Sequence, residues 1–234
     1  MSYGIIYNGK HSYNDLELTI LSSRTIKTPS KVKIKQTIPF MNGSYDFSNL
    51  YGSACYSERT LEYKFLIKSS SRMSLAFTRT RIENWLLGTN YQTKLVDDNL
   101  PGYYYMGECE NVDFTDYIDK GIIKATFTAY PFKISDYFEG NLLWDNFNFE
   151  LDIMQDTKFT VNNEINISIY SNNIINAVPT IITSSEFQII KDNKTFTVKA
   201  GETKDYRFYF RNGKNNLTIK GTGTIEFRFR KEVL

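Results

Sequence analysis

The chain is predicted to be an all-β protein that carries one α-helix and folds as two consecutive β domains. One amphipathic helical pattern, at residues 74–87, lies among long β-like runs between Gly43 and Phe132. From residue 142 to residue 230, short strand-like runs are separated by turn residues, and no helical period is present. Aromatic residues make up 15% of the 234 residues and proline contributes only 5, which favours strands over extended linkers.

The helix is predicted from its ends and from its apolar positions. Ser71 or Ser74 offers a side-chain oxygen for the first turn, and Gly88 is expected to end the helix in a left-handed conformation. A single amphipathic helix must cover its apolar stripe with a sheet. The residues predicted to form this helix core recur at helical spacing: Leu75, Ile82, Trp85 and Leu86.

The strands of the first domain are predicted from alternation and turn residues. Asn8-Gly9 is expected to turn a hairpin between residues 5–7 and 16–21. Further strands are expected at residues 32–40, 60–68, 93–96, 102–107 and 122–130. The periodicity lapses between residues 133 and 141, which is typical of a connection between domains. We therefore expect a first domain at residues 1–134 and a second at residues 135–234.

The second domain reads as a β-sandwich of eight short strands. Lys191 to Lys194, Asn212-Gly213 and Gly221-Thr222-Gly223 are interpreted as the turns between some of them. The expected strands are residues 147–153, 164–170, 179–183, 187–190, 195–199, 206–210, 216–220 and 224–230.

Charge and cysteine usage narrow the classes of function. The 28 basic and 26 acidic residues leave a net charge of +2, which does not favour bulk nucleic-acid binding. Cys55 and Cys109 match neither a zinc cluster nor a redox pair, so both are expected to be reduced thiols. With no apolar stretch that could act as a secretion signal or membrane span, synthesis and folding in a cytoplasm are expected, without membrane insertion.

The sequence predicts no catalytic residue, no bound cofactor and no metal site. His11 is the only histidine and is interpreted as a surface residue beside a turn. Carboxylate pairs such as Asp97-Asp98 or Glu108 with Glu110 could serve glycoside hydrolysis, although carboxylates at turns and strand ends are commonly solvated. A two-domain β protein without a reaction centre usually binds a ligand or partner, or forms part of a larger assembly.

Two surface features leave alternatives open. Lys31, Lys33 and Lys35 share one side of a strand, where they could face a nucleic-acid backbone or form a charged outer face that discourages aggregation. The tyrosines at positions 103–105 could stack on sugars, but core or interface packing is favoured because two strand faces would share them.

The first domain contains a series of short motifs, which are GSYDF at 43–47, RTLEYKF at 59–65, IENWL at 82–86, GYYY at 102–105, GIIKATF at 121–127 and YPF at 130–132. In their order and spacing, these motifs resemble the amino-terminal domain of phage distal tail proteins. In the second half, Gly201-Glu202, NNLTI at 215–219 and GTIEFRFR at 223–230 are similar to the galectin-like sandwich of the same family. The resemblance implies a split β-barrel-like domain with one α-helix, followed by a galectin-like β-sandwich.

The resemblance also implies a function without catalysis. It indicates a structural virion protein that forms a homo-hexameric ring and joins the tail tube to the tail tip or baseplate and the host-adsorption apparatus. The implied partners are the tail tube protein, the tape-measure protein and the tail hub or receptor-binding proteins, and DNA passes through the ring without specific binding. The expected location is the tail tip of a phage or a tail-like bacteriocin particle, after synthesis in the bacterial host cytoplasm.

A ring built by head-to-tail contacts needs two complementary patches on each subunit, and exposed β edges can serve this purpose. We expect the patches on the first domain. The residues predicted to form the oligomer interface are Val32, Ile34, Tyr45, Phe47, Tyr103, Tyr104 and Tyr105. The alternative is a soluble carbohydrate-binding β-sandwich module, which would recognise a host cell-surface saccharide through tyrosines or asparagines.

Overall fold

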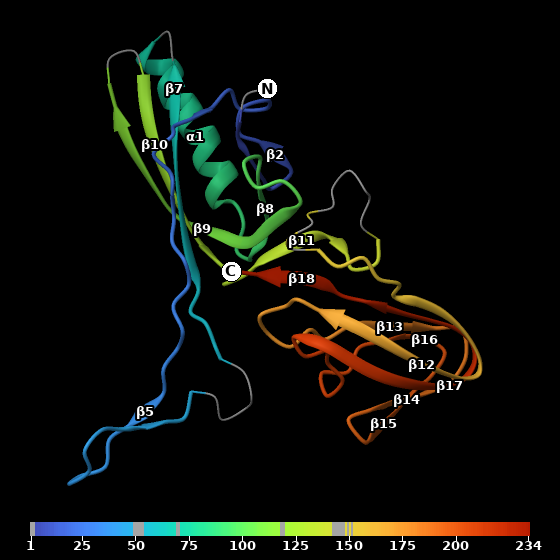
Figure 1. Cartoon of the computed structure of the whole chain (residues 1–234). Coiled ribbons are helices and arrows are strands. Elements are labelled where there is room, and N and C mark those ends of the chain that lie inside the picture. The colour runs from blue at the N-terminus through green and yellow to red at the C-terminus, as the bar shows by residue number, and fades with distance from the viewer. Residues whose placement is uncertain are drawn as a thin grey trace. The chain divides into compact units, whose positions relative to one another are not determined.

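A computed structural model of the chain describes residues 3–48, 54–68, 71–117, 120–141, 148, 150 and 152–234. The chain divides into two compact units (Figure 1). Unit 1 comprises Met1–Ile134 together with Leu234, and unit 2 comprises Ser135–Val233. Both units are built mainly from antiparallel strands, and the described helix belongs to unit 1. The all-β prediction with one helix is therefore confirmed.

Unit 1 contains a curled antiparallel sheet with the strand order β2-β1-β8-β9-β10-β7-β3, and β4 also pairs with β7. A separate two-stranded sheet is formed by β5 and β6. The elements of this unit are β1 (Ile5–Tyr7), β2 (Lys10–His11), β3 (Thr19–Ile20), β4 (Thr25–Ile26), β5 (Lys35–Gln36), β6 (Tyr45–Asp46), β7 (Arg59–Lys68), α1 (Arg72–Leu87), β8 (Thr93–Asp97), β9 (Tyr103–Asp116) and β10 (Lys120–Ala129).

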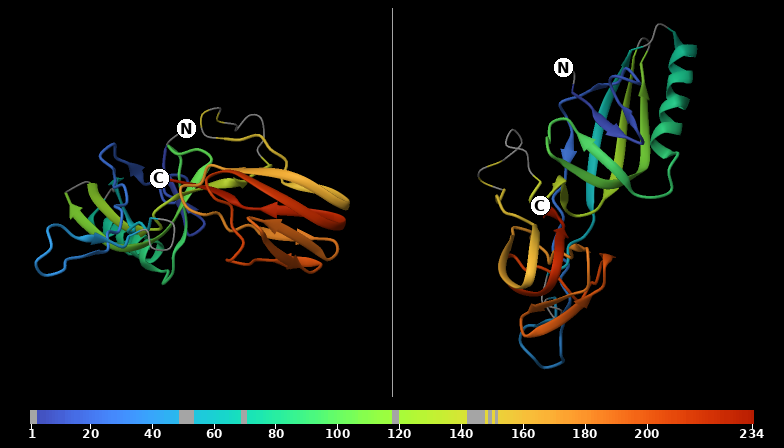
Figure 2. Two further views of the ribbon diagram at one scale, coloured as in Figure 1. Left: turned by 60° about the horizontal axis from the view of Figure 1, so that its bottom comes forward. Right: turned by 90° about the vertical axis from the view of Figure 1, so that its right-hand side faces the viewer.

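The core of unit 1 follows the alternation that the sequence shows. Along β7, the side chains of Leu61, Tyr63, Phe65 and Ile67 are buried and their neighbours are not. β10 pairs with β7 over the whole strand, from Lys120↔Lys68 to Ala129↔Arg59, and alternates in the same way. Figure 2 shows α1 lying along one face of this sheet.

Helix α1 begins two residues before the predicted start. The side chain of Ser71 accepts a hydrogen bond from the Ser74 amide at 3.2 Å, so Ser71 is the N-cap. The expectation of a left-handed Gly88 is wrong, because its φ is −75°. Glycine is needed there for space: a Cβ atom on Gly88 would lie 2.3 Å from the Asn84 carbonyl oxygen.

The buried residues of α1 are Leu75, Ile82, Trp85 and Leu86. The indole Nε1 of Trp85 donates a hydrogen bond to the Tyr7 carbonyl at 2.7 Å, and Asn8 Nδ2 donates to the Trp85 carbonyl at 2.9 Å. Asn8 and Gly9 have φ values of 47° and 71°, as a tight turn requires. The helix is therefore held to the turn between β1 and β2.

The predicted partner strand of this hairpin is wrong. β1 pairs with β2, at Tyr7↔Lys10, and not with residues 16–21. Thr19 and Ile20 pair instead with β7. The turn allows only a short partner strand, and the apolar side chains of Leu16 and Leu18 are buried in the core of unit 1.

Unit 2 is a curled antiparallel sheet that encloses its own core, consistent with the galectin-like prediction. Its strand order is β15-β14-β17-β13-β16, and β12 also pairs with β17. The core combines aliphatic residues from several strands of this sheet with a cluster of phenylalanines. The remaining elements are β11 (Lys133–Phe138), which begins at the end of unit 1, β12 (Lys158–Ser171), β13 (Thr180–Thr183), β14 (Phe187–Lys191), β15 (Lys194–Val198), β16 (Gly201–Thr203), β17 (Gly213–Arg228) and β18 (Arg230–Val233).

The predicted hairpin turn at residues 221–223 is wrong, because these residues lie inside the long strand β17. Gly221 and Gly223 pair with Asn163 and Val161 of β12, with φ values of 144° and 138°. The glycines let the strand bend without a break. On its other side, β17 pairs with β14 before the bend and with β13 after it.

Two further predicted strands differ from the structure. Residues 206–210 form a turn followed by an isolated bridge between Phe210 and Ala177, and Phe210 is fully buried. In the predicted strand at 147–153, residues 147, 149 and 151 lie outside the described residues, and the others are not in a strand. Apolar residues that point into the core from loops resemble a strand in sequence.

Candidate assembly interface

A two-stranded arm leaves the main sheet of unit 1 and carries most of the predicted interface residues. We define the arm as residues 30–57, of which 30–48 and 54–57 are described. Near the base, the Ser57 amide donates to the Ser30 carbonyl and the Val32 amide donates to the Cys55 carbonyl, both at 2.9 Å. Farther out, the Phe47 amide donates to the Ile34 carbonyl at 2.8 Å. Figure 1 shows this arm beside the label β5.

One face of the arm is apolar and exposed. Lys35 is opposite Asp46 and Gln36 is opposite Tyr45, so side chains two residues apart on each strand share a face. The apolar face combines four of the predicted interface residues, with exposed fractions of 41% for Val32, 59% for Ile34, 52% for Tyr45 and 44% for Phe47.

The opposite face of the arm is charged. Lys33 Nζ lies 3.0 Å from Asp46 Oδ2, and the Ser48 amide donates to Asp46 Oδ1 at 2.9 Å. Hydrogen bonds from Ser48, followed by Lys33, hold the pKa of Asp46 well below its ordinary value. Lys35 lies on this face as well, opposite Asp46. The alternating lysines of the sequence therefore lie behind the apolar face, which makes the arm an amphipathic ribbon.

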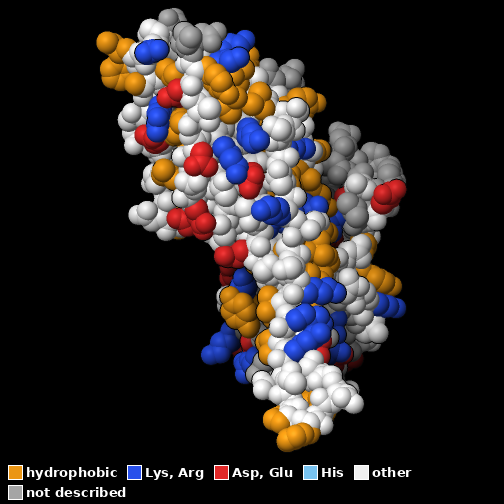
Figure 3. Space-filling view, turned by 90° about the vertical axis from the view of Figure 1, so that its left-hand side faces the viewer, with side chains coloured by type: hydrophobic (Ala, Val, Ile, Leu, Met, Phe, Trp, Pro, Cys, Tyr) orange, Lys and Arg blue, Asp and Glu red, His pale blue; other side chains and the backbone are white. Residues whose placement is uncertain are grey.

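The far end of the arm adds two exposed apolar residues that are not among the predicted interface residues. Ile38 is 47% exposed, and Phe40 is fully exposed with a φ of 65°. Figure 3 shows hydrophobic side chains gathered on the surface at this end. The alternation that links Val32 and Ile34 continues to Ile38 and Phe40, so the pattern that predicted the first pair also contained the second.

The prediction that Tyr105 contributes to an interface is wrong. Tyr105 is only 2% exposed, and its ring lies under the Arg59 guanidinium at 5.4 Å. Burial raises the pKa of its hydroxyl. Tyr103 and Tyr104 are partly exposed, and Lys94 Nζ lies 4.7 Å from the Tyr104 ring centre. Because successive side chains of β9 point to opposite faces, the three tyrosines cannot share one surface.

One of the two carboxylate pairs considered for catalysis, Asp97-Asp98, makes contacts that hold unit 1 together. Asp97 is 1% exposed, receives two hydrogen bonds from Arg24 Nη1 at 3.0 and 2.8 Å, and accepts a third from the Tyr63 hydroxyl at 3.1 Å. Asp98 Oδ2 lies 2.9 Å from Nε2 of His11. The His11 side chain is only 12% exposed, so its interpretation as a surface residue is wrong.

Nowhere in the described ranges do three or more His, Cys, Asp or Glu side chains gather in a way that could hold a metal ion. The described helix falls short of the length and apolar character that a membrane span requires.

Comparison with known proteins gives a match in structure. No protein-family model matches the sequence, and neither does any curated protein. Among solved structures, the chain is similar to the crystal structure of the SPP1 Dit protein (gp 19.1), described as a paradigm of the hub adsorption apparatus in phages that infect Gram-positive bacteria. The TM-score is 0.68 with 13% identity, over 100% of both chains. The chain has the Dit fold.

A second solved structure is that of the phage p2 baseplate in its activated conformation with Sr. It aligns over 99% of this chain and 97% of the other, with a TM-score of 0.41 and 10% identity. Because the likeness to SPP1 Dit covers all of both chains, it includes unit 1 with its helix and unit 2 with its curled sheet.

Proposed function

We propose that this chain is a structural hub subunit of a phage tail tip or baseplate, a distal tail protein whose copies close into a hexameric ring. The observation that carries the proposal is the amphipathic arm of unit 1. The Dit fold supports it, because SPP1 Dit is described as part of a hub adsorption apparatus. In this proposal the chain acts through its shape and has no catalytic role.

The arm fits a contact between subunits for two physical reasons. An isolated two-stranded ribbon is at best marginally stable in water, and this one exposes an apolar face. A ring with one kind of contact is heterologous, so the arm of each subunit meets a different surface on its neighbour. Covering Val32, Ile34, Tyr45 and Phe47 would remove apolar area from water and order the ribbon in the same step.

The proposed ring also defines the proteins that the chain would contact. We propose that it joins the tail tube protein and the tape-measure protein to the tail hub and receptor-binding proteins, and that DNA passes through its opening without specific binding. The subunit would be made in the bacterial host cytoplasm and would function at the virion tail tip. The lysines on the charged face of the arm could then stay in water while the apolar face is covered.

Native mass spectrometry and negative-stain microscopy of the full chain test the proposal. A ring has a mass of six times 27.3 kDa. The double variant Ile34→Ser/Phe47→Ser removes two apolar side chains from the arm, and we expect it to stay monomeric. The matched control Lys31→Ser/Lys35→Ser removes exposed lysines from the same arm and should still close.

Two results would count against the proposal in different ways. Concentrated, folded protein that remains monomeric with the tail tube and hub proteins present would refute the ring. If the Ile34→Ser/Phe47→Ser variant assembles as readily as the unaltered chain, the ring stands but the arm is not its contact.

A further inference from the structure

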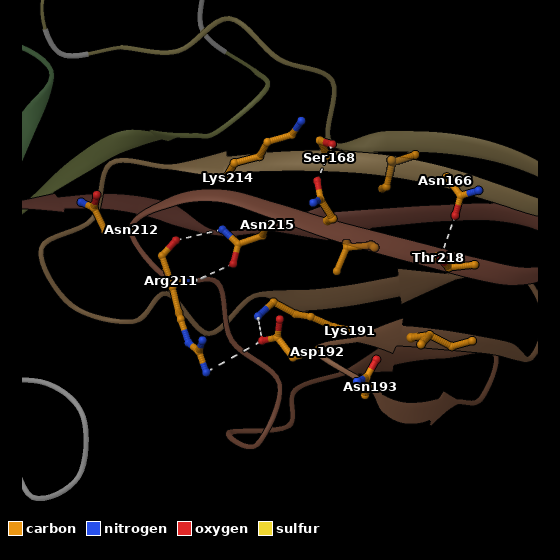
Figure 4. Close-up of a pocket in the computed structure, with 14 residues that line it drawn as sticks. Asn166, Ser168, Lys191, Asp192, Asn193, Arg211, Asn212, Lys214, Asn215 and Thr218 are labelled. Carbon is orange, nitrogen blue, oxygen red and sulfur yellow. Dashed lines mark hydrogen bonds and ion pairs between the residues drawn. The ribbon is translucent and has the colours of Figure 1, made fainter.

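Unit 2 contains a polar groove of about 530 Å³ that the proposed ring does not use (Figure 4). Its origin lies in the pairing of β17. β14 pairs with β17 only as far as Ile190↔Thr218 within the described residues, whereas β12 pairs with β17 along its full length to Ser171↔Gly213. Where β14 leaves β17, the Lys191–Asp192–Asn193 turn and the segment around Arg211 form the walls of the groove.

One wall is held in place by a buried asparagine. Asn215 is 4% exposed, and its Nδ2 donates to the carbonyls of Arg211 at 2.8 Å and Gly213 at 3.1 Å. Its Oδ1 accepts from the Arg211 amide at 2.9 Å. Asn212 Nδ2 in turn donates to the Asn173 carbonyl at 2.9 Å. These bonds fix the backbone that carries the Arg211 side chain before any ligand arrives.

The other wall is a tight turn with a buried cation. Asp192 and Asn193 have φ values of 50° and 59°, as the turn between β14 and β15 requires. The Lys191 side chain is 6% exposed, and its Nζ lies 2.9 Å from Asp192 Oδ2. A hydrogen bond from Lys191 and the nearby charge of Arg211 hold the pKa of Asp192 below its ordinary value.

The groove is also lined by outward-facing side chains of β12 and β17, which form a ladder of amides and hydroxyls. Thr218 Oγ1 donates to Asn166 Oδ1 at 2.6 Å, and Ser168 Oγ donates to Asn216 Oδ1 at 2.9 Å. Each of these pairs retains donors and acceptors that can turn towards a ligand. Such groups match the hydroxyls of a sugar ring.

The lining combines this ladder with an excess of positive charge. The charged residues of the lining are three cations, Lys191, Arg211 and Lys214, and one carboxylate, Asp192. Among the described residues that line the groove, none is aromatic. Neutral sugars and single-stranded nucleic acids rely strongly on stacking against aromatic rings. A hydroxyl-rich ligand with its own negative charge suits this lining better.

We propose that the groove binds an acidic oligosaccharide, a chain of sugar hydroxyls that bears phosphate or carboxylate groups. Arg211 and Lys214 each offer a cation to an anionic group of the ligand, and Asn166, Ser168 and Asn216 pair with the hydroxyls. The groove volume lies within the range of small-ligand sites. This inference does not depend on the ring, because every residue that it uses belongs to unit 2.

Isothermal titration of the full chain tests the proposal. The probes are a phosphorylated mannopentaose, a tetragalacturonate, neutral mannopentaose and inorganic phosphate. We expect one or both acidic oligosaccharides to bind at least about tenfold more tightly than the neutral one and than inorganic phosphate, a difference of about 1.4 kcal/mol. The better acidic probe distinguishes phosphate from carboxylate.

Variants locate the binding site. We expect Arg211→Ala and Lys214→Ala each to weaken the acidic probe about tenfold, because each removes a charge-assisted contact. The control Lys199→Ala removes an exposed lysine that follows β15 at the end opposite the turn. We expect this variant to bind the acidic probe as tightly as the unaltered chain does. Unaltered melting curves for the Arg211 and Lys214 variants would separate lost binding from lost folding.

Several results would overturn the proposal. These are no binding of either acidic probe, equal binding of neutral and acidic mannopentaose, or an equal loss in the Lys199 control, which would indicate diffuse attraction. Competition by single-stranded DNA at equal affinity would also overturn it. The Ile34→Ser/Phe47→Ser variant should bind like the unaltered chain, so a failed ring and a failed groove can be told apart.

Discussion

Replacement of Trp85 by alanine is the sharpest test of how α1 is held to unit 1. Trp85 is 5% exposed, its ring lies edge-on to Tyr7 with the ring centres 6.3 Å apart, and its Nε1 donates to the Tyr7 carbonyl at 2.7 Å. Removing a buried tryptophan side chain costs about 3–5 kcal/mol. We expect a loss in the upper part of this range, because the Tyr7 carbonyl also loses its donor.

Two companion variants separate the sources of this loss. Trp85→Phe keeps most of the buried volume but removes the indole donor, so it should cost about 1–3 kcal/mol. Phe77→Ala removes an aromatic side chain of the same helix that is 72% exposed, and should change the free energy of unfolding by less than about 0.5 kcal/mol.

The assay must report unit 1 alone, because the chain has two units and its unfolding need not be two-state. Hydrogen exchange of peptides from β7 and β10 meets this need. These two strands pair with each other in the sheet of unit 1, and α1 covers one face of that sheet. The free energy of opening follows from their slowest amides. A Trp85→Ala loss below about 1 kcal/mol, or no greater than that of Phe77→Ala, would refute the packing described for α1.

Three further predictions concern stability and thiol reactivity. Arg24→Ala should destabilise unit 1 by about 2–3 kcal/mol in the same exchange assay, because it leaves the buried Asp97 carboxylate without its cation while Tyr63 still donates; an unchanged value would contradict the buried ion pair. Gly221→Ala should lower the stability of unit 2 by about 1–3 kcal/mol in urea unfolding, because a Cβ would lie 2.6 Å from the Phe187 ring. Gly213→Ala, where a Cβ meets no atom within 4 Å, should cost less, and the reverse order would count against the bend in β17. Burial raises the pKa of Cys109 to about 12, whereas Cys55 is exposed, so Ellman's reagent should titrate one thiol in the native chain and two after denaturation; rapid reaction of both thiols in the native chain would contradict the burial of Cys109.

The sequence predicts an element well where its apolar residues follow a single period, either that of a strand or that of a helix. The alternation of β7 and the spacing of Leu75, Ile82, Trp85 and Leu86 each indicate one buried face, and the structure buries those residues. Tyr105 shows that composition alone does not predict exposure. Three adjacent tyrosines suggest an interaction surface, but the alternation of the strand places the third tyrosine in the core.

The pairing of strands that are distant in sequence determines parts of the fold that local sequence signals do not predict. Gly221-Thr222-Gly223 has the composition of a turn, but the partners Val161 and Asn163 of β12 keep the chain extended through it. The groove of unit 2 shows the same effect, since Asn166 and Thr218 are 52 residues apart and meet only through strand register. No local motif could have assembled its lining from β12, the turn after β14 and the start of β17.

The two proposals make a joint prediction about avidity. A hexameric ring would present six copies of the groove, so a polymer with many acidic sugar units could occupy several copies at once. Linked sites of this kind gain about 10²–10⁴-fold in apparent affinity without any new contact. On a surface coated with acidic polysaccharide, the ring should therefore dissociate far more slowly than the monomeric Ile34→Ser/Phe47→Ser variant, although a single acidic oligosaccharide should bind both equally. Equal dissociation of the ring and the variant from the coated surface would show that the copies cannot engage one polymer together, because avidity requires simultaneous contact.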